Sequence, residues 1–199
     1  MPKKHNPVTS SKIDTSLTEA HDGVLDITQL ADMHPRLPGD MVATMLTRAA
    51  LGLQRNHHLP GVALHLTVEE VKTRLRLEWP SADSESIGQH DFNRITEDGA
   101  EAIVLAVAHR SKGWQVLRRM QREESADWLL EHISQGTRRL VAVEVSGVDS
   151  GNVATRLREK LEQVAKNKDK DIAQRWAGVV GFKKPQGVLE MARTSHRGR

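Results

Sequence analysis

Two adjacent apolar runs in residues 124–146, ESADWLLEHISQGTRRLVAVEVS, constrain the fold more than any other part of the chain. Each run is long enough for one strand, and Gly136 between them favours a turn, so the segment predicts two neighbouring strands of one sheet. An acid stands in each run, Asp127 in the first and Glu144 in the second. The sequence therefore predicts two carboxylates on neighbouring strands.

Such a pair of acids suits a hard divalent cation. Mg²⁺ and Mn²⁺ prefer oxygen ligands, and carboxylates supply them. The strand around Glu144 is almost continuously apolar and should be buried on both faces, where a lone carboxylate needs a cation or a donor to stay charged. An arginine such as Arg118 or Arg139 is the alternative partner for Glu144, and an ordinary strand-edge or turn residue is the alternative for Asp127.

The region 95–182 predicts an α/β fold. Helical spacing indicates a helix that Thr96 caps and Gly113 ends, and a second helix follows the third strand. Three strands can form an antiparallel meander, and the fourth returns through the second helix and can pair in parallel. The expected result is an αβββαβ core, a central mixed four-stranded sheet flanked by helices, with elements at 96–113, 114–120, 125–133, 138–146, 152–168 and 175–182.

The other segments are predicted to be additions to this core. Residues 26–34 and 39–56 have helical spacing, and 62–79 alternate as a β-hairpin, with a single helix over 69–79 as the alternative. The polar stretch 80–91 is a linker. The expected organisation is a disordered tail (1–20), a helix-and-hairpin elaboration (21–94), the core (95–182) and a basic C-terminal tail (183–199).

Composition bounds the classes of partner. The formal net charge of +3 is compatible with a polyanion. The absence of cysteine excludes disulfides and thiolate metal sites, and it fits a cytoplasmic protein. No apolar run reaches the roughly 18 residues of a membrane span. Lys183 and Lys184 could contact phosphates, and the loop 146–152 could direct backbone amides at an anion or be a plain turn.

The order of elements and the two acids resemble the PD-(D/E)XK nuclease superfamily, which has a restriction-endonuclease-like fold. The resemblance covers residues 95–182 and implies Asp127 and Glu144 as metal ligands. It departs from the motif at two positions: Ala126 stands in place of the proline, and Ser146 stands where the motif has lysine. A serine hydroxyl can hold a water molecule but supplies no positive charge.

A basic residue on the helix 152–168 is the expected substitute for that lysine. Arg156, Lys160 and Gln163 are spaced i, i+4 and i+7, opposite an apolar stripe. The resemblance to RecB-like branches implies Lys160 or Gln163 as the relocated residue, while a solvated helix face is the alternative. The resemblance also implies a metal-ligating glutamate on the preceding helix, and Glu101 suits this better than Glu97 because its neighbours are more apolar.

The resulting hypothesis is a Mg²⁺- or Mn²⁺-dependent nuclease that hydrolyses phosphodiesters of nucleic acid, with DNA as the expected substrate. Its expected catalytic residues are Asp127, Glu144, Ser146, Lys160 and Gln163, and its metal ligands are Asp127, Glu144 and Glu101. We expect a homodimer or a subunit of a larger complex, without a membrane partner. One alternative is a non-catalytic subunit of a bacterial DNA-processing or defence complex, and another is an α/β protein that binds a small molecule.

Overall fold

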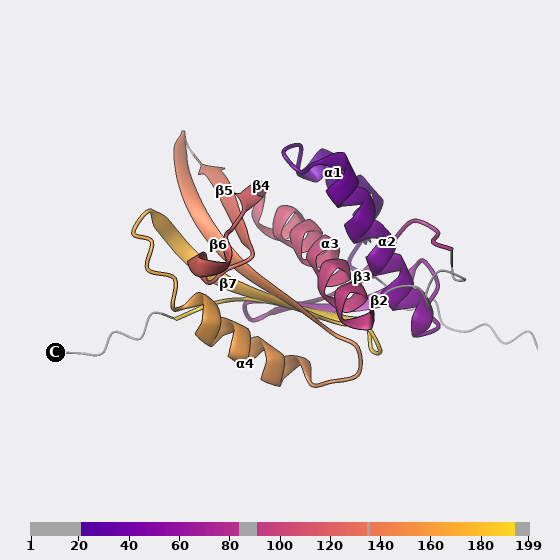
Figure 1. Ribbon diagram of the computed structural model, residues 1–199. Helices are drawn as coiled ribbons and strands as arrows, with labels where there is room; N and C mark the ends of the chain where they lie inside the picture. The colour runs from indigo at the N-terminus through magenta and orange to yellow at the C-terminus, as the bar shows by residue number, and fades with distance from the viewer. Residues whose placement is uncertain (1–20, 84–90, 135, 194–199) are drawn as a thin grey trace, which may run out of the picture.

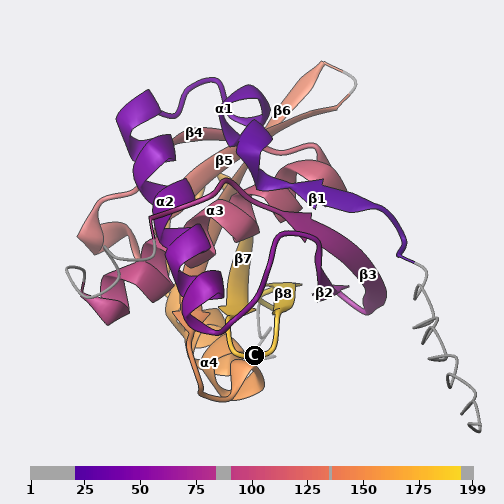
Figure 2. The ribbon, with the colours of Figure 1, turned by 90° about the vertical axis from the view of Figure 1, so that its right-hand side faces the viewer.

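A computed structural model describes residues 21–83, 91–134 and 136–193 of the chain. In these residues the strands form one eight-stranded mixed sheet, and Figures 1 and 2 show it from two sides. The strand order is β1-β3-β2-β8-β7-β6-β5-β4. The α/β class and the central mixed sheet are confirmed, but the sheet has eight strands where four are predicted for the core. The strands are β1 (Val24–Asp26), β2 (Val62–Val68), β3 (Val71–Glu78), β4 (Gln115–Arg119), β5 (Trp128–Ser134), β6 (Thr137–Val148), β7 (Ile172–Gly181) and β8 (Gln186–Met191).

Helices lie on both faces of this sheet. Figure 1 shows α1 (Leu30–Met33), α2 (Gly39–Arg55) and α3 (Phe92–Lys112) on one side and α4 (Val153–Val164) on the other. Short 3-10 helices occupy Ile27–Gln29 (η1) and Arg122–Glu124 (η3). Within the described residues, no helix has both the length and the apolar character that crossing a membrane requires.

The predicted core order, αβββαβ, is present as α3, β4, β5, β6, α4 and β7. Strands β4, β5 and β6 form an antiparallel meander, and β7 pairs in parallel with β6 after the α4 crossover. Alternate residues of β6 face opposite layers: Val143 and Val145 join the core under α3, whereas Ala142 packs with Val164 of α4. Glu144 therefore faces α4.

The central helix α3 is buried along most of its length and begins earlier than predicted. Its N-cap is Asp91, whose side chain accepts a hydrogen bond from the backbone N–H of Asn93 (2.8 Å). The prediction of Thr96 as N-cap was wrong, because Asp91 offers a carboxylate cap one turn upstream and Thr96 lies inside the helix. Gly113, in the left-handed region at φ +67°, ends the helix as predicted.

The hairpin prediction for residues 62–79 is confirmed, and the single-helix alternative was wrong. β2 and β3 pair antiparallel around Glu69, which adopts φ +57° in the turn. The prediction of a tail from residue 183 onward was wrong for 186–191. These residues form β8, which pairs antiparallel with β7 and in parallel with β2. β8 thus joins the N-terminal hairpin and the core in one sheet. The predicted tail at 1–20 lies outside the described residues.

Candidate functional site

Glu144 of β6 is the most deeply buried acid of the predicted site. Its side chain is 2% exposed, and Nζ of Lys160 donates to its Oε1 at 2.6 Å. Its other oxygen, Oε2, is buried without a hydrogen-bond partner in the described structure. Burial raises the pKa of Glu144 to about 7; the charge of Asp127 adds to this increase, and Lys160 opposes it.

Asp127 lies immediately before β5 and is fixed by the backbone of both flanking strands. Its N–H donates to the carbonyl of Val143 (3.1 Å), and its carbonyl accepts from Met120 (2.8 Å). Its carboxylate oxygen Oδ2 accepts a hydrogen bond from the N–H of Val145 (2.7 Å). This bond places the Asp127 side chain beside Glu144, and the side chain is only half-buried.

Glu101 lies on α3, on the opposite side of the sheet from the α4-facing side chain of Glu144. It is buried, and its carboxylate forms a two-pronged ion pair with the guanidinium of Arg119 in β4, at 2.8 and 3.3 Å. Burial raises the pKa of Glu101 to about 7; Arg119 opposes this increase, and the charge of Asp127 adds to it. Asp127 is thus close to both glutamates, whereas Glu97 lies exposed on the same helix.

The helix α4 places Lys160 against Glu144 and Gln163 beside Lys160. Asn152 caps the helix by accepting from the N–H of Thr155 (3.0 Å), and Leu157 and Val164 are buried against the sheet. Lys160 Nζ also donates to Oε1 of Gln163 at 3.1 Å. Lys160 lies three residues after Leu157 and four before Val164, so it stands at the edge of the buried stripe and its ammonium group reaches Glu144 of β6.

Two predicted partners lie elsewhere. Arg156 pairs with Glu159 on the surface of α4 (3.1 Å), and Arg118 pairs with Glu124. The alternative of an arginine partner for Glu144 was therefore wrong for Arg118, because Lys160 occupies that place. Ser146 lies on the same face of β6 as Glu144 and is also buried.

Sequence reasoning missed Arg119 as the partner of Glu101. Its guanidinium is about half-exposed and lies 5.1 Å from the ring centroid of Trp128. The signal available was its place in the Arg118-Arg119 pair at the end of an alternating strand. That signal indicates an exposed cation but not which acid it meets.

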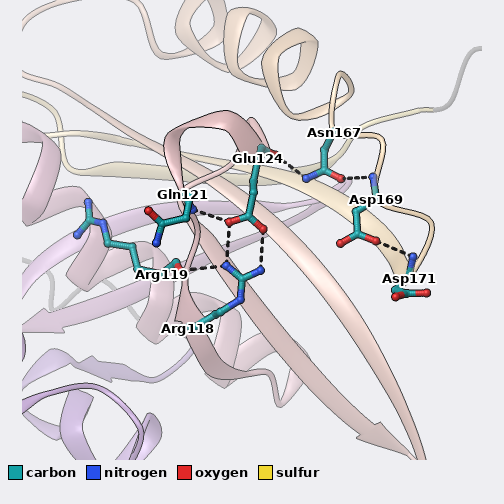
Figure 3. A network of polar contacts seen from close by, with 7 residues as sticks. All are labelled: Arg118, Arg119, Gln121, Glu124, Asn167, Asp169 and Asp171. Atoms are coloured by element: carbon teal, nitrogen blue, oxygen red, sulfur yellow. Dashed lines mark hydrogen bonds and ion pairs between the residues drawn. The ribbon is translucent and has the colours of Figure 1, made fainter.

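A polar network holds together the two loops beside the site (Figure 3). Both oxygens of the Glu124 carboxylate accept from Arg118, at 2.6 and 2.8 Å, and its carbonyl accepts from the amide of Asn167 (2.5 Å). Hydrogen bonds from Arg118 and from the backbone of Gln121 lower the pKa of Glu124 to about 2. The network joins the β4–β5 connection to the loop after α4. Asp127 follows the first of these segments, and the helix α4, which carries Lys160, precedes the second.

The donor chemistry fits a magnesium-type ion. Among the described residues, no group of three or more His, Cys, Asp or Glu side chains is arranged to hold a metal. Mg²⁺, however, is commonly held by one or two carboxylates together with water and substrate phosphate. Asp127 and Glu144 supply two neighbouring carboxylates, and Oε2 of Glu144 has an unused acceptor. These are the oxygens that could hold such an ion.

Comparisons with protein-family models, curated proteins and solved structures gave no significant match to this chain.

Proposed function

We propose that the chain is a metal-dependent nuclease related to the PD-(D/E)XK superfamily, acting on nucleic acid and most readily on DNA. The observation that carries the proposal is the 2.6 Å contact between Lys160 and Glu144. Lys160 supplies, from α4, the positive charge that Ser146 cannot supply from the motif position. The αβββαβ order supports the same assignment, because the two acids and the lysine come from the elements that the superfamily uses.

In this proposal each side chain has a separate task. Asp127 and Glu144 would hold the metal ion, which when bound would supply a Lewis acid for phosphodiester hydrolysis. Lys160 keeps positive charge beside Glu144 and stabilises negative charge that develops at a phosphate. Gln163 accepts from Lys160 and restrains its ammonium group. Arg119 balances the charge of Glu101, which is a structural neighbour of Asp127 in this proposal.

A specific observation favours the second candidate, a non-catalytic binding or assembly subunit. Both buried glutamates of the predicted site already have cationic partners from the protein, Lys160 for Glu144 and Arg119 for Glu101. Buried ion pairs of this kind also occur as purely structural features. A cytoplasmic location, and a homodimer or larger complex, stay predictions under either candidate.

Cleavage of labelled single- and double-stranded DNA with Mn²⁺ or Mg²⁺ tests the proposal. Wild type should cleave, and Asp127→Asn and Glu144→Gln should each reduce the rate by about 100-fold or more, because each removes a metal ligand. Glu123→Gln is the matched control, since Glu123 is an exposed acid outside this cluster. An absence of wild-type cleavage with either metal, or cleavage that persists in both variants, would favour the non-catalytic subunit.

A further inference from the structure

The α4 side of β3, β2 and β8 is a polar sheet face beside the helix. α4 packs on β6, β7 and the adjoining part of β8 (Figure 1). The apolar side chains of β2 and β3 lie on the opposite face of the sheet, where they join the core with α2 and α3. The buried ones are Leu64, Leu66, Leu75 and Leu77. The intervening side chains face the α4 side, and in the described structure they are half-buried or exposed.

Three cations stand in a row on this face. Lys72, Arg74 and Arg76 occupy alternate positions of β3, which puts successive side chains roughly 7 Å apart along the strand. The facing positions of β2 are small or polar: Thr67 lies opposite Lys72, and His65 lies opposite Arg74. A hollow of about 280 Å³ is lined by His65, Thr67, Lys72 and Arg74 of these strands and by Asp22.

A larger hollow adjoins this row at the N-terminal end of α4. It has a volume of about 580 Å³ and is lined by Asp149 and the rest of the loop before α4, by the start of α4, and by Lys183, Lys184 and Gln186. Gln186 pairs in register with His65, so β8 connects the two hollows across neighbouring strands. The N-terminus of α4 adds the positive end of a helix dipole.

The nearby acids are mostly engaged. Glu78 pairs with Arg76 (3.0 Å), and Asp22 accepts from the backbone N–H of Arg74 (2.7 Å). Asp149, in the loop before α4, accepts from Asn56 (2.9 Å). Glu190 lies at the opposite end of β8 from Gln186, away from Lys183 and Lys184.

We propose that this face, defined by Lys72, Arg74, Arg76, Lys183 and Lys184, binds the phosphate backbone of nucleic acid. Regularly spaced cations on a polar sheet match the repeating negative charge of such a chain. The tryptophans of the described residues are buried, so the face offers no tryptophan for base stacking and contacts the backbone with little sequence preference. The inference rests on the proposed function and adds a holding surface separate from the carboxylates.

Binding of a fluorescent oligonucleotide, single- or double-stranded, tests this surface. Anisotropy is measured in EDTA, so that binding occurs without cleavage. Lys72→Gln/Arg76→Gln and Lys183→Gln/Lys184→Gln should each weaken binding by about tenfold at low salt. Each should also reduce the slope of log affinity against log salt by about 2. Arg94→Gln/Arg139→Gln is the charge-matched control at exposed sites on α3 and at the far end of β6, and it should bind like wild type within about twofold.

The outcomes separate this inference from the nuclease proposal. No measurable wild-type binding, or equal weakening in the control, would overturn the inference. If wild type cleaves and both face variants bind as tightly as wild type, the nuclease proposal stands and the proposed binding surface is wrong. If the face variants weaken binding but wild type cleaves with neither Mn²⁺ nor Mg²⁺, the binding surface stands and the nuclease proposal is wrong. Thermal unfolding of every variant establishes that each one is folded under the conditions of the binding measurement.

Discussion

At the scale of single residues, Glu144 and Lys160 depend on each other. Removing one partner of a buried ion pair leaves the other charge unpaired, which costs several kcal/mol unless that group changes its protonation. Glu144 can do so, because burial raises its pKa to about 7. With a folded-state pKa above the unfolded value, its contribution to stability is present at low pH and is lost as the pH rises through about 7.

Lys160→Met should therefore destabilise the protein in a pH-dependent way. At about pH 8 the free energy of unfolding should fall by roughly 2–4 kcal/mol, and near pH 5.5 by much less, because Glu144 then carries a proton. Urea unfolding at both pH values measures the difference. In a Glu144→Gln background, Lys160→Met should lower the free energy of unfolding by nearly the same amount at both pH values. Equal losses at the two pH values in the otherwise wild-type chain would contradict the account.

The sequence could predict these two residues but not the partner of Glu101. Apolar flanks mark Glu144 as buried. Helical spacing groups Lys160 with Arg156 and Gln163 on the polar side of its helix, and the resemblance to RecB-like branches singles out Lys160 or Gln163 from that group. Glu101 and Arg119 are 18 positions apart, and only the packing of α3 beside β4 brings them together. No local pattern encodes that distance.

At the scale of elements, His34 connects three of them. It ends α1 and is fully buried. Its Nδ1 accepts from the backbone N–H of Val116 in β4 (3.1 Å), so its Nε2 carries the proton and donates to the carbonyl of Leu105 in α3 (3.0 Å). Both ring nitrogens are used in the neutral form, and burial lowers the pKa of His34 to about 4.

This histidine should make stability fall with acid. Its contribution is fully present above about pH 6.5 and is lost as the pH falls toward 4, by up to roughly 3 kcal/mol. The contributions of Glu101 and Glu144 to stability change in the opposite direction, rising as the pH falls from about 7 to 4.5. Urea unfolding of wild type and His34→Leu across this range therefore isolates the histidine, because both proteins carry the two glutamates. The variant should be less stable at neutral pH but lose less on acidification. Parallel curves would contradict this role.

Most elements were predictable because their patterns are long. The apolar spacing of α2 and the alternation of β2 and β3 extend over many residues, which is why the helix and the hairpin were expected. β8 was missed since Leu189 is its one large fully buried side chain, and the strand is defined by the neighbours β7 and β2 on either side. A short strand between two partners carries little signal of its own.

At the scale of the molecule, β8 makes the two predicted units one sheet. Its parallel pairing with β2 and antiparallel pairing with β7 connect the N-terminal hairpin to the strand beside Glu144. The close approach of Gly99 to Ala49, where an added Cβ would lie 2.9 Å from the backbone, joins α3 to α2 as well. The hairpin and the core should therefore unfold together.

Leu189→Ala tests this cooperation. The buried leucine should cost roughly 2–5 kcal/mol when truncated. Hydrogen exchange read by mass spectrometry in increasing urea follows the β2–β3 and β5–β6 segments separately. Both should lose protection at one urea concentration in the wild type and at one lower concentration in the variant. Opening of the hairpin well before the β5–β6 segment would indicate two independent units.

Mn²⁺ binding measured by calorimetry tests the central claim, a metal site built on Asp127 and Glu144, most directly. Wild type should bind Mn²⁺ with an affinity that increases as the pH rises through about 7, because Glu144 must lose its proton to bind. Asp127→Asn/Glu144→Gln should abolish this binding, while Glu123→Gln/Glu162→Gln, which removes two exposed acids, should leave it unchanged. Wild type that binds no Mn²⁺ across this pH range, or binding that survives the loss of both carboxylates, would contradict the account.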